Sequence, residues 1–230
     1  MTMTLTNTGL IDLSDTTVRE ANATLQAATE GAFTLANPGG KHALACGLQH
    51  PVSVTIKGHT GYYAGGMNKL AEITIEGNAG TGLAENIMSG VVRVTGDASQ
   101  SAGATGHGGL VVIEGNASAR CGISMKGVDI VVGGNVGHMS AFMAQAGNLV
   151  VLGDAGPDLG DSIYEAQIFV RGSVDRLGTD CIEKEMRPEH IALVAQLMDR
   201  AGLYADPAEF RRYGSARQLY HFKIDNAGAY

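Results

Sequence analysis

Two nearly identical stretches, IEGNAGTG at residues 75–82 and IEGNASAR at residues 113–120, lie 38 residues apart. The glycine in the third position of each stretch recurs at a fixed spacing of 19 residues through the middle of the chain. It occupies seven positions: Gly58, Gly77, Gly96, Gly115, Gly134, Gly153 and Gly172. A fixed repeat of this length indicates a solenoid, in which each repeat forms one coil and packs only on its neighbours.

The residues four and two positions before each of these glycines are aliphatic in every repeat. Ile73 and Ile75 fill these two positions in one repeat, and Val92 and Val94 fill them in the next. The position directly before the glycine is mostly polar. Such alternation is typical of a short strand with one buried side. We therefore expect Ile75 and Val94 to lie directly one above the other in neighbouring coils.

Small residues fill the rest of each repeat in a G-x-x-G-x-x-x-G pattern, which is complete at Gly58, Gly61 and Gly65. Glycine permits positive φ at a tight corner, and its missing side chain lets coils approach closely. The period is not a multiple of six, and the remainder leaves no room for the helix of a leucine-rich repeat. The sequence thus predicts an all-β protein: a right-handed parallel β-helix of about seven 19-residue coils with N- and C-terminal α-helical caps.

The residue directly after each repeat glycine is polar, and such residues could act either as ligands or as a structural ladder. The column holds His59, Asn78, Asp97, Asn116, Asn135, Asp154 and Ser173. Side chains stacked at about 4.8 Å can hydrogen-bond from one coil to the next. We favour the structural ladder, and we assign the seven repeat glycines as structural corner residues.

Three regions follow from the pattern: an N-terminal segment with a capping helix (1–31), the β-helix (32–180), and C-terminal helices with a docking tail (181–230). Thr17 and Glu20 form a capping box that begins a helix through Thr29. Pro188 begins a second helix that ends at Gly202, and a shorter helix is predicted from residue 206 to about residue 213. We expect the first two helices to cover the two ends of the stack.

The last stretch of the chain, RQLYHFKIDNAGAY, alternates aromatic and aliphatic side chains with polar ones. Tyr220, Phe222 and Ile224 either pack back on their own domain or dock on a partner subunit.

Bulk composition excludes several classes of function. The net charge is −7 and no block of Lys or Arg occurs, which argues against nucleic-acid or membrane partners. No secretion signal is apparent, and three widely spaced cysteines fit a reduced, cytoplasmic protein. The histidines lack the spacing of metal ligands. We expect no catalytic residue, cofactor or metal site in this chain.

Two groups of residues have side chains capable of chemistry, but we interpret both as structural. Four acids surround a turn and are more typical of a polar loop than of a carboxylate site: Asp154, Asp158, Asp161 and Asp175. Arg120 could lower the pKa of the neighbouring Cys121 thiol. A small buried hydrophobic residue is the commoner role of such a cysteine.

The glycine pattern, preceded by IDLSDTTVREANATL, resembles the C-terminal β-helix (GXGXG) domain of the glutamate synthase large subunit over roughly residues 10 to 180. The strings GISMKGVDIVVGGNVGHMSAFMAQAG, GDSIYEAQIFVRGSV, DCIEKEMRPEH and FRRYGSARQLYHF resemble a stand-alone version of that domain. This version is the middle subunit of N-methylglutamate synthase and of related glutamate-synthase-like complexes. The chain lacks the longer acidic and aromatic insertions of the large glutamate synthase domain.

The resemblance implies a hetero-oligomer that makes N-methylglutamate from methylamine and glutamate. Its partners would be a glutamine amidotransferase-like subunit and a glutamate synthase-like subunit carrying FMN and iron–sulfur clusters. This chain would hold the other two in place. Two alternatives stay open at this point: the β-helix subunit of a formylmethanofuran-dehydrogenase-type complex, and a polysaccharide-acting β-helix enzyme.

Overall fold

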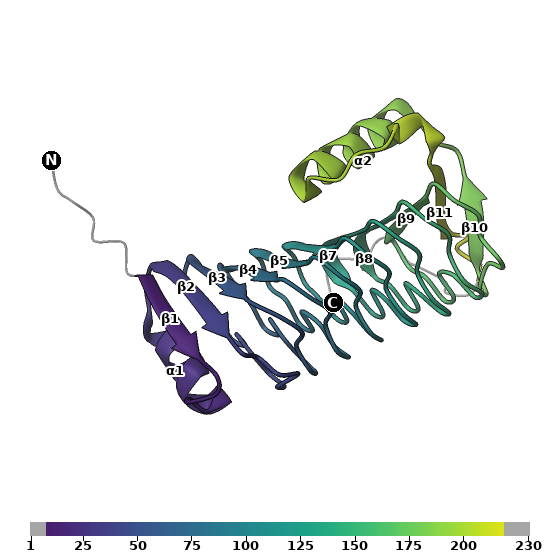
Figure 1. The fold of residues 1–230 in the computed structure, drawn as a ribbon. Helices are drawn as coiled ribbons and strands as arrows, with labels where there is room; N and C mark the ends of the chain where they lie inside the picture. The colour runs from purple at the N-terminus through teal and green to yellow at the C-terminus, as the bar shows by residue number, and fades with distance from the viewer. Residues whose placement is uncertain (1–7, 219–230) are drawn as a thin grey trace, which may run out of the picture.

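The computed structural model describes residues 8–218 and contains one long coiled stack (Figure 1). Eleven strands occur in it: β1 (Thr8–Asp12), β2 (Gly31–Ala36), β3 (Val52–Ile56), β4 (Glu72–Ile75), β5 (Val91–Val94), β6 (Leu110–Ile113), β7 (Lys126–Val132), β8 (Ala146–Val151), β9 (Gln167–Val170), β10 (Cys181–Lys184) and β11 (Arg211–Ser215). The helices are α1 (Val18–Ala27), α2 (Pro188–Ala201) and a 3-10 helix, η1 (Pro207–Glu209).

All of these strands belong to one sheet, with the order β1-β2-β3-β4-β5-β6-β7-β8-β9-β11-β10. Each strand from β1 to β9 pairs in parallel with the next, and the last two pairings are antiparallel. Ile75 lies opposite Val94, and Ile73 opposite Val92. The vertical adjacency that the repeat predicts is therefore confirmed, and with it the parallel β-helix.

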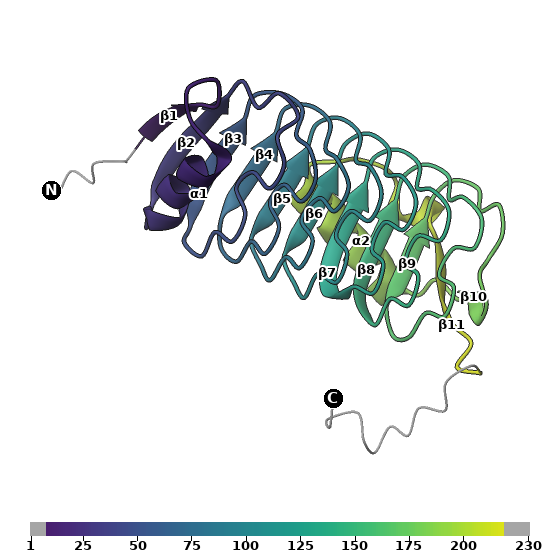
Figure 2. The ribbon, with the colours of Figure 1, turned by 90° about the horizontal axis from the view of Figure 1, so that it is seen from below.

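The second wall of each coil is held by a row of isolated parallel bridges. This row runs through Thr60, Ala79, Ala98, Ala117, Val136, Ala155 and Val174. The aliphatic columns of the strands point inward and are almost completely buried, as at Ile75 and Val94. Figure 2 shows the coils stacked along the axis that these two rows define. The core is thus a continuous aliphatic column rather than a central cluster.

Helix α1 covers the first coil. Thr17 and Glu20 form the predicted capping box, with the Glu20 amide donating to Thr17 Oγ1 at 3.2 Å. Ala21 and Leu25 are buried against the interior column. Asn22 donates from Nδ2 to the Ala43 carbonyl at 2.7 Å, which supplies a partner to a coil edge that has no coil below it. The N-terminal cap is therefore present.

Helix α2 begins at Pro188 and ends at Gly202 in the left-handed conformation, as the sequence predicts. Contrary to our expectation, it does not cover the end of the stack. Figure 1 shows it lying along the sheet. Its apolar face packs on the outer surface of the sheet, and the cluster includes Leu110, Val112, Val131, Val150, Phe169, Val194, Leu197, Met198 and Ala201. The helix follows this surface because β6 to β9 turn apolar side chains outward as well as inward.

The C-terminal end of the stack is closed by β10 and β11 instead. The prediction of a helix through about Tyr213 was wrong. Asp206 does begin η1 by accepting from the Ala208 amide, but the chain then extends into β11. Pairing with β9 on one side and β10 on the other outweighs local helix propensity here. Tyr213 and Cys181 seal the interior column.

Candidate functional site

The repeat glycines are required by close packing more than by backbone conformation. Only Gly58 of the seven has a positive φ, at +131°. Positive φ instead recurs seven positions later in the repeat, at Gly65, Gly103, Gly122 and Gly160. At Gly77 a Cβ would lie 2.7 Å from the Gly58 carbonyl carbon of the coil below. At Gly115 a Cβ would overlap Asp97 Oδ1 and lie 2.8 Å from the Gly96 carbonyl oxygen. Their structural role stays a prediction until these positions are substituted.

The polar column forms the hydrogen-bonded ladder that we favoured. Asn78 Oδ1 accepts from the Asp97 amide at 3.0 Å, and Asp97 Oδ1 accepts from the Asn116 amide at 2.7 Å. The same bond, repeated 19 residues apart, continues to Ser173. Because these side-chain oxygens are already bonded to backbone amides, the column is a structural element. Within residues 8–218 no group of three or more His, Cys, Asp or Glu could hold a metal ion.

Three carboxylates of the acidic turn form hydrogen bonds with neighbouring residues. Asp154 belongs to the ladder, where the Ser173 amide and hydroxyl donate to it and lower the pKa of its carboxyl. Asp158 forms a bidentate pair with Arg176, both contacts at 2.9 Å. Asp161 Oδ2 accepts from the Thr179 amide at 3.1 Å. These carboxylates are engaged by their neighbours, which fits a polar turn.

Cys121 is completely buried. Burial raises the pKa of its thiol to about 12, so the neighbouring Arg120 does not activate it. Cys181, at the far end of the column, likewise has a thiol pKa raised by burial to about 12. Both thiols are protonated at neutral pH and act as small apolar core residues.

Large apolar side chains are exposed in two successive coils near the N-terminal end, a feature that the repeat pattern did not predict. Five of the eight large hydrophobic residues exposed within residues 8–218 lie between residues 62 and 88. We name them the apolar cluster: Tyr62, Tyr63, Met67, Leu70 and Met88. Tyr62 stacks on His42 with ring centroids 4.5 Å apart, and Tyr63 meets Tyr62 edge-on. Exposed aromatic and methionine side chains are enriched at interaction surfaces.

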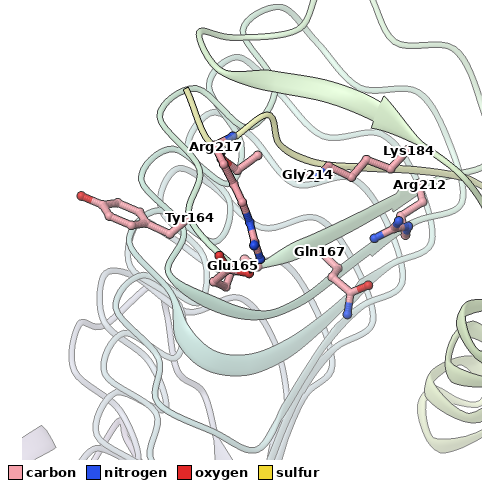
Figure 3. A pocket seen from close by; sticks show the side chains of 9 residues that line it. Tyr164, Glu165, Gln167, Lys184, Arg212, Gly214 and Arg217 are labelled. Atoms are coloured by element: carbon pink, nitrogen blue, oxygen red, sulfur yellow. Dashed lines mark hydrogen bonds and ion pairs between the residues drawn. The ribbon is translucent and has the colours of Figure 1, made fainter. Parts of the chain in front are cut away.

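A pocket of about 200 Å³ lies where β9, β10 and β11 meet, and we name it the C-terminal pocket (Figure 3). Its walls are polar and rich in basic side chains. They consist of Tyr164, Glu165, Ala166, Gln167, Lys184, Arg212, Gly214, Ser215 and Arg217. Sequence reasoning missed it because its residues come from three separate stretches that only the antiparallel strands bring together. The predicted docking residues Tyr220, Phe222 and Ile224 lie outside the described residues.

The fold defines a parallel β-helix protein. The side chains of its polar ladder and acidic turn form hydrogen bonds that stabilise the structure. The chain is 59% identical over 226 residues to Protein GlxC of Rhizobium meliloti (strain 1021), covering 96% of this chain and 99% of that protein. It belongs to the GlxC family. No family model matches the chain. The relation is consistent with the resemblance to glutamate-synthase-like subunits.

In the described part of the chain, neither α-helix has the length and apolar character needed to cross a membrane.

Proposed function

We propose that this chain is a non-catalytic structural subunit of a glutamate-synthase-like complex, and specifically of N-methylglutamate synthase. In this role it holds an amidotransferase-like subunit and a subunit with FMN and iron–sulfur clusters in one cytoplasmic assembly. The complex would join methylamine to glutamate during methylamine use. The particular complex rests on the sequence resemblance, which extends beyond the repeat into both ends of the chain.

The observation that carries the subunit role is the apolar cluster on a rigid stack. Met67 is 57% exposed, and Tyr62 and Tyr63 are about half exposed. Leaving so much apolar surface in water is unfavourable, at roughly 25 cal/mol per Å², and docking a partner would remove that cost. The interior of the described coils is filled by aliphatic side chains, so we base the subunit role on the outer surface of the stack.

Co-expression with the two partner subunits tests this proposal. The isolated chain should be colourless, and the complex should carry the flavin and iron–sulfur absorption of its partner. A flavin or iron–sulfur spectrum in the isolated chain would overturn the non-catalytic role. Failure of the three chains to co-purify would overturn the complex itself.

Single substitutions locate the docking surface. Met67→Lys should weaken co-purification strongly, since it places a charge in the proposed apolar contact. The matched control is Tyr204→Lys, because Tyr204 is 83% exposed and lies outside the apolar cluster. Both variants should melt like the parent chain. Equal co-purification of the two variants would rule out the apolar cluster as the contact.

A further inference from the structure

The C-terminal pocket concentrates positive charge on a protein that is acidic overall. Lys184, Arg212 and Arg217 line it, and Glu165 is the one carboxylate among its lining residues. The chain as a whole has a net charge of −7. A concave site of one sign, against a background of the other, attracts small ions of opposite charge.

Two of the three cations have no ion pair within residues 8–218. Arg217 donates from Nη2 to Glu165 at 2.6 Å, as the close-up in Figure 3 shows. Arg212 donates from Nε to the Glu185 carbonyl oxygen at 3.0 Å, which leaves its two terminal nitrogens for other acceptors. Burial, followed by the nearby Arg187, lowers the pKa of the Arg212 guanidinium. A bound anion would relieve this unfavourable environment.

Gly214 lines the pocket without a side chain. Gly214 is buried, and the atom closest to a Cβ at this position would be Lys184 Cε at 3.7 Å, an ordinary contact distance. Its φ lies outside the left-handed region, so the backbone does not demand glycine there. A larger side chain would occupy the space over which the Lys184 stem now lies. We therefore expect a branched side chain at this position to fill part of the pocket.

The rim is held in place by a local network. Ser215 Oγ donates to Asp180 Oδ2 at 2.7 Å and accepts from the Arg217 amide at 2.9 Å. The Gln218 amide donates to the other oxygen of Asp180 at 2.9 Å. These bonds fix the turn that aims Arg217 at Glu165, so the site is ordered before any ligand arrives.

We propose that the C-terminal pocket binds a small dicarboxylate from solution. One carboxylate would lie between Lys184 and Arg212, and the other would share the guanidinium of Arg217 with Glu165. Arginine forks bind planar carboxylates through paired hydrogen bonds. The pocket volume of about 200 Å³ suits a small acid of four or five carbons. This proposal does not rest on the proposed function.

Isothermal titration calorimetry of the full chain with succinate tests it. We expect saturable binding with a dissociation constant in the millimolar range or below. Acetate should bind more weakly, and neutral succinamide should not bind. Lys184→Gln should weaken succinate at least about tenfold, because it removes a charged hydrogen-bond donor. The matched control, Lys126→Gln, removes an exposed lysine from β7 and should leave the affinity unchanged.

A second variant separates loss of the site from loss of the fold. Gly214→Val should abolish succinate binding by filling the pocket, while far-UV circular dichroism and the melting temperature stay close to those of the parent. Absence of saturable succinate binding to the parent chain would overturn the proposal. So would equal affinity in the parent and Gly214→Val chains, or tighter binding of inorganic phosphate than of succinate.

Discussion

The outer face of the sheet is polar and bare over the early coils, and apolar and covered over the later ones. In one outward-facing column, Thr55, Thr74 and Arg93 are partly exposed. Over the next four coils, the same column continues as Val112, Val131, Val150 and Phe169, all completely buried under α2 and its neighbours. The inward columns do not change between the two regions. The repeat therefore determines which residues are apolar in the interior. On the outer face, the residues are apolar where the C-terminal segment covers the sheet.

Arg93 marks the boundary between the two regions. Its Nη2 donates to the Ala201 carbonyl oxygen at the end of α2 at 2.6 Å, and its Nη1 pairs with Glu114 at 2.8 Å. A guanidinium at a helix C-terminus satisfies carbonyls that have no partner within the helix. The apolar outer face begins one coil later, at Val112.

The largest effect should come from breaking the interior that both regions share. Gly115→Val would drive a branched side chain into Asp97 and the Gly96 carbonyl, and we expect a loss of at least about 4 kcal/mol in the free energy of unfolding. Chemical denaturation measures it. Gly214→Ala is the matched control, because a Cβ there makes only ordinary contacts. If Gly115→Val unfolded at the same denaturant concentration as the parent, the coil register would be wrong.

A charge introduced on the outer face of the sheet should lower the stability of the covered region much more than that of the bare region. Val150→Asp places an unpaired carboxylate beneath α2, and we expect it to cost about 3 kcal/mol of unfolding free energy. Thr74→Asp makes the corresponding change on the bare face and should cost less than about 0.5 kcal/mol. Thermal melting of the two variants checks the difference. Similar losses in both would mean that α2 does not cover the later coils in solution.

The boundary residue should have a smaller effect. Arg93→Met keeps most of the apolar stem but removes the bond to Ala201, and we expect a loss of about 1 to 2 kcal/mol. Hydrogen exchange should rise selectively in the last turn of α2. Lys57→Met is the control, since its pair with Glu76 is exposed and should contribute little. Unchanged exchange in α2 would show that Arg93 does not anchor the helix.

The smallest effect concerns the ladder, which crosses both regions. Hydrogen bonds from Ser173 lower the pKa of the Asp154 carboxyl, so its titration by NMR should fall below the ordinary value of about 3.9. The ionised form contributes stability above that ordinary value, and the contribution is lost as the pH falls through the lower folded-state pKa. Asp154→Asn should keep the ladder, as Asn116 and Asn135 do, and should lose this pH dependence. Titration at or above the ordinary value would argue against the bond.

The sequence was sufficient for everything that the 19-residue period controls. The inward columns, the pairing of Ile75 with Val94 and the polar ladder all repeat locally, so a single period reveals them. The capping box at Thr17 was also readable, because its two partners lie three residues apart. Local spacing carries this information without knowledge of the rest of the chain.

The missed features depend on residues far apart in the chain. The switch from Thr74 to Val131 in the outward column was visible in the sequence and could have shown that a helix covers the later coils. By contrast, β11 pairs with strands about 30 and 40 residues away, and no local pattern announces that pairing. The C-terminal pocket depends on this pairing and was therefore beyond the reach of sequence reasoning.

The reversed strands at the C-terminal end also bear on self-association. A stack of parallel strands that ended as it began could add further copies head to tail and grow into a filament. Here β11 and β10 turn the pairing pattern antiparallel, while β1 at the opposite edge retains the parallel pattern. Because β10 runs antiparallel to β11, and β11 antiparallel to β9, the edge strand β10 again points the same way as β1. Within the described residues, the row of bridges that forms the second wall ends at Val174, so β10 offers a further copy one wall of a coil and not both.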